Sequence, residues 1–237
     1  NLLTDGSDVR RKFMDQTIAQ SNPAFLHALI CYNRALSQRN ALLKYFAANR
    51  TFDADTLTLY DDQLCEYAPL IHEARERFVE AFVPMLKHNY AQIAGDEEDV
   101  DLRYRSKLHE MSMRNLLTES LAKDRLLQYS TAGPHREDLL FELHGRSLRQ
   151  VGSQGQQKSY LVALKLATFD SLTENLGAKP ILLLDDVFDK LDADRVEGLI
   201  RLVNDDHFGQ IFLSDTHRDR TELLLQAVDA QAKVFEL

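Results

Sequence analysis

The spacing of apolar residues divides the sequence into two parts. In residues 8–128 glycines are rare and apolar side chains recur every three or four positions, a spacing that predicts long amphipathic helices. From Gly133 onward, short apolar runs alternate with helical segments, which predicts a largely parallel sheet covered by helices. We therefore expect an α/β fold with a large helical part, divided into a helical arm over residues 1–130 and a sheet-containing lobe over residues 131–237.

The clearest helix is predicted over residues 21–50. Ser21 or Asn22 can cap its first turn, and Pro23 fits inside that turn because its missing N–H has no partner there in any case. The predicted apolar face consists of Phe25, Leu26, Leu29, Ile30, Leu36, Leu42, Leu43 and Phe46.

A second long helix is predicted from Asp55 to Ile93. We expect it to bend or break near Pro69 and Pro84, because an interior proline lacks a backbone N–H and clashes with the preceding turn. Joined by a short link, the two long helices form an antiparallel arm.

Shorter elements follow. The acidic stretch GDEEDVD at 95–101 is expected to be a solvated turn, and Leu139, Phe141 and Leu143 alternate as in a strand that enters a hairpin at His144 and Gly145. The other predicted elements are strands at 102–105, 181–184, 210–215 and 232–237 and helices at 116–128, 153–169, 194–204 and 218–228.

Composition limits the class of protein. The net charge of −9 argues against a surface that is basic overall, although a local basic patch is still compatible with it. Cys31 and Cys65 form no C-x-x-C pair, so neither a disulfide framework nor a thiolate metal site is expected. No apolar run approaches the roughly 18–20 residues of a membrane span, and we expect a cytoplasmic protein without a membrane partner.

Two acids end the apolar run PILLLDD at 180–186. In open α/β sheets, ligands bind at the carboxyl ends of the strands, where Asp185 and Asp186 are predicted to lie. Adjacent strand residues point to opposite faces, so one carboxylate can hold Mg²⁺ while the other orients a water. From these residues alone, a plain turn at the end of a strand is an equally good interpretation.

The stretch SQGQQK at 153–158 gives an apolar helix a polar start. Ser153 can cap the helix, and Gly155 lets the backbone approach a ligand closely. The unpaired amides and the helix dipole then favour an anion such as phosphate. Taken alone, a capped helix behind a flexible loop is the simpler interpretation.

Together, the two stretches resemble the signature, Walker B and D-loop series of ABC-type ATPases. Residues 153–156 align with the signature Ser-Gly-Gly-Gln, with Gln154 in place of its first glycine. Asp189 replaces the usual serine of the D-loop, which ends at Asp192. In SDTHRD at 214–219, Thr216 or His217 stands at the place of the switch histidine.

Further segments resemble the RecF family, the DNA replication and repair ATPases related to SMC proteins. TAGPHREDL at 131–139 is similar to that family's Gly-Pro-His-Arg-Asp-Asp, with Glu137 in place of the first aspartate. SDVRRKFMD at 7–15 and LSQRNALLK at 36–44 are similar to its arginine-containing stretches near the helical arm. The resemblance implies a P-loop NTPase head lobe of the ABC/SMC type. No G-x-x-x-x-G-K-[ST] loop occurs in the 237 residues, so we expect a piece of a longer chain that lacks the Walker A lobe.

The resemblance also implies roles for residues. Two heads would dimerise with ATP between them, as a homodimer in which each copy contacts the nucleotide held by the other. Asp185 would hold Mg²⁺, Asp186 would activate water, and His217 would be the second catalytic residue. The residues implied in nucleotide binding are Ser153, Gln154, Gly155, Gln156, Lys158 and Asp192. For Lys158, a solvated surface lysine is an equally good interpretation.

The remaining implied partners are DNA and a RecR-like recombination mediator protein. Double-stranded or gapped DNA would be gripped through its phosphates by Arg10, Arg11, Arg34, Arg39 and Arg50, although ion pairs on helix faces account for any one of them equally well. The implied function is ATP-dependent loading of a recombinase at gaps, with ATPase activity in the full-length protein and none in this piece alone. Two alternatives stay open: another ABC-type branch, SMC-like or overcoming-lysogenization-like, and a helical interaction module without nucleotide chemistry.

Overall fold

The computed structural model describes residues 2–185, 191–203, 207–214 and 233. The chain forms two compact units, which are Asn1–Glu80 with Arg103–Leu140 (unit 1) and Ala81–Leu102 with Phe141–Leu237 (unit 2). The chain passes between the units inside helix α3 (Ala54–Ala94) and inside strands β1 (Val100–Arg105) and β2 (Asp138–Leu143). Each unit is therefore assembled from separate stretches of sequence, and the division at residue 130 stays a prediction.

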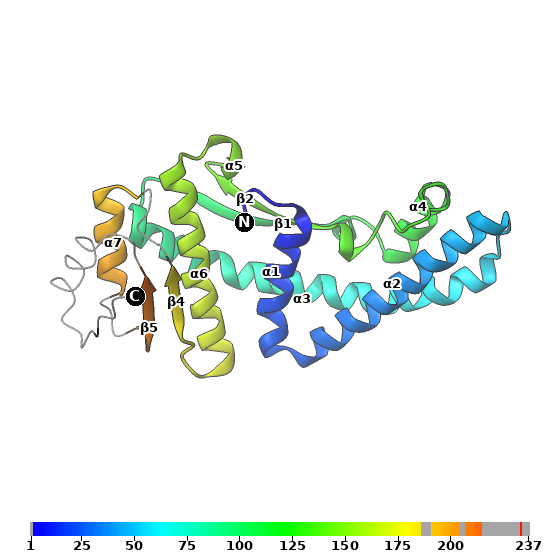
Figure 1. Ribbon diagram of the computed structural model, residues 1–237, viewed down its shortest axis with the longest axis horizontal. Helices are drawn as coiled ribbons and strands as arrows, with labels where there is room; N and C mark the ends of the chain where they lie inside the picture. The colour runs from blue at the N-terminus through cyan, green and yellow to red at the C-terminus, as the bar shows by residue number, and fades with distance from the viewer. Residues whose placement is uncertain (1, 186–190, 204–206, 215–232, 234–237) are drawn as a thin grey trace. The chain divides into compact units, whose positions relative to one another are not determined.

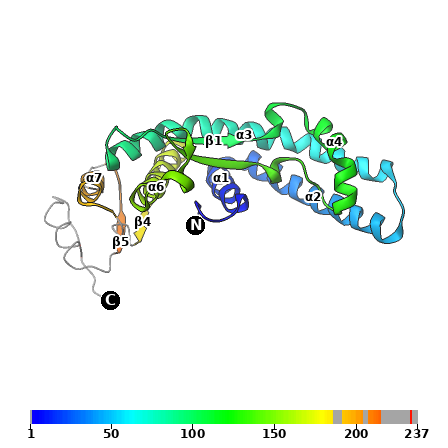
Figure 2. The same cartoon turned by 90° about the horizontal axis from the view of Figure 1, so that it is seen from above.

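Unit 1 is helical. Helix α1 (Ser7–Ser21) precedes α2 (Pro23–Asn49), and α2 lies alongside the first part of α3 in the opposite direction (Figures 1 and 2). Leu43, Phe46 and Leu57 pack together between these two helices. The predicted antiparallel arm is confirmed. The unit is completed by η1 (Lys107–His109), α4 (Met113–Leu127) and η2 (Pro134–Arg136).

Helix α2 begins where the sequence predicts. Asn22 Oδ1 accepts a hydrogen bond from the Phe25 N–H at 2.9 Å, with Pro23 as the first helical residue. The buried face differs from the predicted one, because Leu26 and Ile30 are 41% and 59% exposed. The buried residues are Phe25, Ala28, Tyr32, Ala35, Arg39, Leu43 and Phe46. Small and polar side chains thus complete a stripe that apolar spacing alone does not identify.

Helix α3 runs without interruption through 41 residues, so a break at Pro69 or Pro84 is wrong, whereas the other predicted form, a bend, stays a prediction. Each proline removes one backbone hydrogen bond, at a cost on the order of 3 kcal/mol. Fully buried side chains occur on both sides of each proline: Leu64, Ala68, Ile71, Phe82, Leu86 and Tyr90. Burying one large apolar side chain contributes about 1.5–3 kcal/mol, so this packing offsets the lost bonds.

A buried ion-pair network lies at the middle of the arm. Arg39 is fully buried; its Nε donates to Asp61 Oδ1 at 2.6 Å and its Nη1 to Asp124 Oδ2 at 2.7 Å. Asp124 is also fully buried and accepts from the Thr131 N–H at 2.8 Å. The prediction that Arg39 grips DNA is therefore wrong, because a guanidinium inside the protein cannot reach a phosphate.

A second network surrounds Arg75, which is 2% exposed. Its guanidinium donates to both carboxylate oxygens of Asp15 at 2.9 Å and to Glu137 Oε2 at 2.7 Å. The Glu137 carboxylate also accepts from the hydroxyls of Tyr104 and Ser106. The Gly-Pro-His-Arg stretch before Glu137 is a turn, as its glycine and proline predict, and Gly133 has a φ of 121° that favours glycine.

The described strands form two sheets. Strands β1, β2 and β3 (Arg146–Ser147) form a sheet in that order, and β2 and β3 are antiparallel. The hairpin between β2 and β3 turns at His144 and Gly145, whose φ values of 51° and 69° suit a two-residue turn. Strands β4 (Leu182–Asp185) and β5 (Ile211–Ser214) are parallel, with Asp185 opposite Ser214 (Figure 1).

Helices accompany these strands. They are α5 (Leu148–Val151), α6 (Gln154–Leu176) and α7 (Ala193–Val203). Helix α6 is buried nearly all round, which confirms a core helix, and Tyr160 Oη donates to the Asp101 carbonyl at 2.7 Å. Leu182 and Leu184 of β4 are buried, whereas Leu183 is 65% exposed. The predicted helix at 218–228 lies outside the described residues, as does the predicted strand at 232–237 apart from Lys233. No helix among the described residues is long and apolar enough to span a membrane.

Replacing Arg39 with alanine should destabilise the chain by about 3–5 kcal/mol, because Asp124 would keep a buried and unpaired charge. Urea unfolding monitored by circular dichroism measures the effect. Arg34→Ala, an exposed position on the same helix, is the control and should change stability by no more than about 0.5 kcal/mol. Equal effects of the two substitutions would contradict the assignment.

Stability should fall as pH decreases from about 6.5 to about 4, in part because of His135. Burial lowers the pKa of His135 from 6.5 to about 4, with Arg136 and Arg11 adding to the shift while the Ser130 carbonyl and Asp124 oppose it. The unfolded chain therefore binds a proton in this interval that the folded chain does not, which destabilises the fold by up to about 3 kcal/mol.

His135→Gln should flatten the dependence of the unfolding free energy on pH between these values. His88→Gln, at an exposed position of α3, serves as the control. An unchanged slope in His135→Gln would assign the acid sensitivity to other groups.

Candidate functional site

The start of α6 is held by its own side chains. Ser153 Oγ accepts from the Gln156 N–H at 3.2 Å, and Gln156 Oε1 accepts from the Ser153 N–H at 2.8 Å, which forms a capping box. Ser153 and Gln154 are exposed, and Gly155 and Gln156 are half-buried. The backbone amides of the first turn, which have no partner inside the helix, therefore lie at an accessible and fixed helix start.

Glu98 ties this helix start to the rest of unit 2. Its Oε1 accepts from Gln156 Nε2 at 2.9 Å and from Arg195 Nη2 at 2.7 Å, and its other oxygen accepts from the Tyr90 hydroxyl. Burial alone would raise the pKa of Glu98, but hydrogen bonds from Tyr90 and Gln156 and the charge of Arg195 outweigh it and lower the pKa. The prediction of a solvated turn at 95–101 is wrong at Glu98, whose side chain is only 18% exposed.

Arg195 carries the connection on to the start of α7. Besides Glu98, its guanidinium donates to Ser159 Oγ of α6 at 2.9 Å and to Asp192 Oδ2 at 3.1 Å. Asp192 in turn caps α7, because its Oδ1 accepts from the Arg195 N–H at 2.9 Å. The aligned signature and D-loop segments are thus linked by Glu98 and Arg195 inside one chain.

The predicted metal ligand lies at a strand end. Asp185 is the last residue of β4, is exposed, and accepts a hydrogen bond from the hydroxyl of Ser214, the last residue of β5. Two oxygen-bearing side chains therefore meet at the carboxyl edge of the parallel pair. Asp186 and His217, the predicted catalytic residues, lie outside the described residues, as does Thr216.

The predicted DNA-binding arginines differ in their surroundings. Arg10 forms a two-pronged pair with Asp138 at 2.7 and 3.0 Å, and Arg11 donates to the Glu137 carbonyl at 2.7 Å. Burial lowers the pKa of Arg11, and the nearby charge of Arg75 lowers it further. Arg34 and Arg50 are exposed on α2 and at its end. Of the five, these two present the most accessible charge, whereas Arg39 is inside the arm.

Glu98 and Arg195 were not identified from the sequence as functional positions. Glu98 comes from an acidic stretch without a periodic pattern and Arg195 from the polar side of a predicted helix, and they are separated by 97 residues. One signal was available, since Glu98 and Arg195 have opposite charges and Arg195 follows the D-loop acid by three positions, the spacing at which side chains share a helix face. That signal does not identify Glu98 as the partner of Arg195, because several acids are available in residues 95–101.

Comparison with known proteins gives relatives over the whole chain. The DNA replication and repair protein RecF of Flavobacterium johnsoniae is 48% identical over 237 residues, which is all of this chain and 66% of that protein. RecF of Parabacteroides distasonis is 44% identical over the same length, which is 64% of that protein. The chain belongs to the RecF family. It spans a little less than two thirds of the length of these RecF relatives.

Solved structures agree with this membership. A structure of the recombination mediator protein RecF-ATP in the RecFOR pathway matches with a TM-score of 0.79 and 29% identity, covering 92% of this chain and 60% of that one. The match confirms the predicted fold class, an ABC/SMC-like P-loop ATPase head lobe with a helical arm. No protein-family model matches the chain.

Proposed function

We propose that this chain supplies one side of an ATP site in a RecF-family DNA-repair ATPase, and that a second copy supplies the opposite side. The observation that carries the proposal is the connection from Gln156 through Glu98 to Arg195 and Asp192. This connection fixes the start of α6 and the start of α7 in one unit. A site completed by another copy needs such a surface, because its polar groups must be in position before the nucleotide arrives.

The start of α6 is suited to a phosphate. Its dipole and unpaired amides favour an anion, and the Ser153 hydroxyl, which accepts from the Gln156 N–H, still has its own hydrogen to donate. Ser153, Gln154, Gly155 and Gln156 would contact the terminal phosphate of ATP bound by the second copy. Lys158, four residues into the helix, and Asp192, at the cap of α7, would complete the surface that closes on the nucleotide.

The end of β4 is suited to a magnesium ion. A carboxylate and a hydroxyl are hard oxygen donors, and Asp185 and Ser214 place one of each at the same strand edge. When bound, Mg²⁺ neutralises part of the phosphate charge. Asp185 would hold the ion directly or through its water, Asp186 would orient and deprotonate the attacking water, and Thr216 or His217 would contact the terminal phosphate.

The wider function follows the RecF relatives. We propose cytoplasmic action in recombinational repair, with ATP-dependent dimers at double-stranded or gapped DNA and a RecR-like mediator as the protein partner in recombinase loading. Within this chain, Arg34 and Arg50 are the arginines proposed to contact DNA phosphates. Arg10 already pairs with the Asp138 carboxylate, and Arg11 already donates to the Glu137 carbonyl. The family relationship favours this function over the SMC-like and overcoming-lysogenization-like alternatives.

In a full-length RecF-family protein that contains this chain, Ser153→Arg and Ser153→Asp should abolish dimerisation by ATP and Mg²⁺. Arginine adds bulk at the contact, whereas aspartate keeps a good helix cap but places a negative charge against the phosphate. Analytical ultracentrifugation with and without ATP measures the monomer–dimer ratio. Monomer binding of ATP should be unchanged in both variants.

Two controls separate the proposed contact from folding. Ser147→Arg, at an exposed position of β3, should dimerise like the wild type. Ser153→Asp should unfold within about 0.5 kcal/mol of the wild type, since aspartate caps as well as serine. Wild-type dimerisation of both Ser153 variants would refute the proposed phosphate contact. If the full-length protein still hydrolysed ATP at the normal rate with Asp185→Asn or Asp186→Asn, these acids would not take part in hydrolysis. That result would favour the alternative in which this chain is a helical module without nucleotide chemistry of its own.

A further inference from the structure

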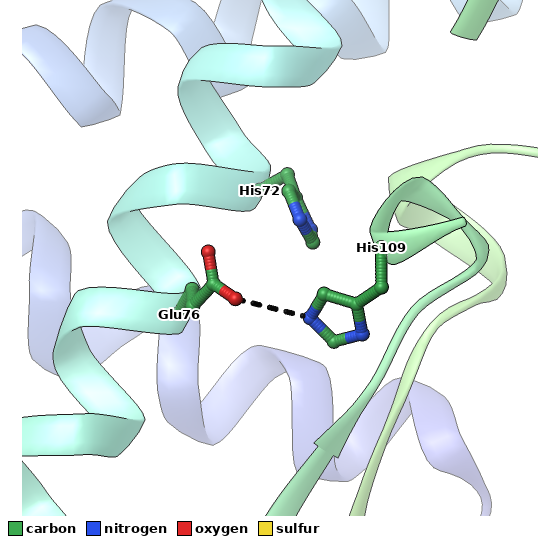
Figure 3. Close-up of side chains that lie close together, drawn as sticks. All are labelled: His72, Glu76 and His109. Atoms are coloured by element: carbon green, nitrogen blue, oxygen red, sulfur yellow. Dashed lines mark ion pairs between the residues drawn. The ribbon is translucent and has the colours of Figure 1, made fainter. Parts of the chain in front are cut away.

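Three side chains with metal-ligating atoms converge in unit 1, whereas the proposed nucleotide site belongs to unit 2. His72 and Glu76 lie one turn apart on α3, and His109 is the last residue of η1 (Figure 3). One ligand atom from each residue lies within 4.8 Å of the others, and His109 Nε2 is 3.4 Å from Glu76 Oε1. A spacing of four residues puts two ligands on the same face of a helix, and η1 supplies the third from another segment.

One ring nitrogen of His72 has no hydrogen-bond partner among the described residues. The residue is 9% exposed, and its buried Nδ1 makes no hydrogen bond to any described residue. The nearest carboxylate oxygen, Glu137 Oε1, is 4.0 Å from Nδ1, too far for a hydrogen bond. Leaving a buried polar atom without a partner costs about 1–3 kcal/mol. An unsatisfied imidazole beside two other metal-ligating side chains therefore indicates a missing metal ion.

The ring of His72 is also held in place by neighbouring rings. It packs 5.6 Å from the Tyr104 ring and 4.8 Å from the His109 ring, which limits its orientation. His72 and His109 line a surface pocket of about 460 Å³, so an ion has a path from solvent.

We propose that His72, Glu76 and His109 bind a divalent transition metal ion of the zinc type. Zinc bonds to histidine nitrogen and carboxylate oxygen are about 2.0–2.2 Å long, which puts neighbouring ligands of a tetrahedron about 3.3 Å apart. The His109–Glu76 distance already has this value, and small side-chain movements bring in the third ligand. Two imidazoles and one carboxylate suit zinc far better than magnesium or calcium, which prefer oxygen alone.

The ion has a structural consequence within unit 1. It would join α3 to η1, a short 3-10 turn that also contacts α3 through the exposed His109–Glu76 pair and the His72–His109 ring contact. Three protein ligands leave a fourth position for water.

Titration of the untagged protein with Zn²⁺ alone, followed by isothermal calorimetry, tests the proposal. We expect one strong site per chain, and Co²⁺ should give the intense visible absorption of a tetrahedral complex. His109→Ala and Glu76→Gln should each weaken Zn²⁺ binding at least about tenfold. Both side chains are partly exposed, so neither change should unfold the chain.

The matched control is His88→Ala, an exposed histidine elsewhere on α3, which should bind Zn²⁺ like the wild type. Zinc should also raise the urea midpoint of the wild type and of His88→Ala but not that of His109→Ala. Absence of a strong site, or binding that survives both His109→Ala and Glu76→Gln, would overturn the proposal.

Discussion

Arg39, Arg75 and Arg195 lose most of their contact with water in the folded chain, and each pairs with a carboxylate from a distant segment. Arg39 and Arg75 are 0% and 2% exposed, and the side chain of Arg195 is 12% exposed. Removing a charge from water costs several kcal/mol unless partners replace the solvent, so the segments that carry the carboxylates cannot move away independently. This constraint decides which segments of each unit pack together around the buried charges.

In unit 2 the constraint has a functional consequence. Arg195 and Glu98 hold the starts of α6 and α7 together through Gln156, Ser159 and Asp192. Ser153 and Gln154 stay exposed at the same helix start. A surface of this kind, held by hydrogen bonds but open at its proposed phosphate-binding end, suits the proposed ATP site between two copies. The RecF family membership and this arrangement support each other, since they come from independent observations.

The sequence predicts the elements far better than it predicts the buried charges. The cap at Asn22, the core helix after Ser153 and the hairpin at His144 and Gly145 each follow from local residue preferences, and the structure has all three. Local preference fails at Pro69 and Pro84, where packing along α3 outweighs the missing hydrogen bonds.

The candidate site divides in the same way. The helix start and the strand-end acid were predicted from local pattern, whereas Glu98 and the burial of Arg39 were not. Arg39 pairs with Asp124 across 85 residues and Glu98 with Arg195 across 97, and nothing in the sequence near any of them identifies the partner. An amphipathic pattern classifies a charged residue as exposed, so an arginine that pairs with carboxylates inside the protein is assigned to the wrong side of its helix.

The coupling between Glu98 and Arg195 tests the account most directly. Unfolding free energies of Glu98→Ala, Arg195→Ala and the double variant, measured in urea, give the interaction energy of the pair. We predict a coupling energy of about 1–3 kcal/mol between Glu98 and Arg195. In the control cycle, Glu97→Ala replaces Glu98→Ala at an exposed neighbouring position, and the coupling with Arg195 should be near zero. Additive effects of Glu98→Ala and Arg195→Ala would contradict the claim that this pair holds the two helix starts together.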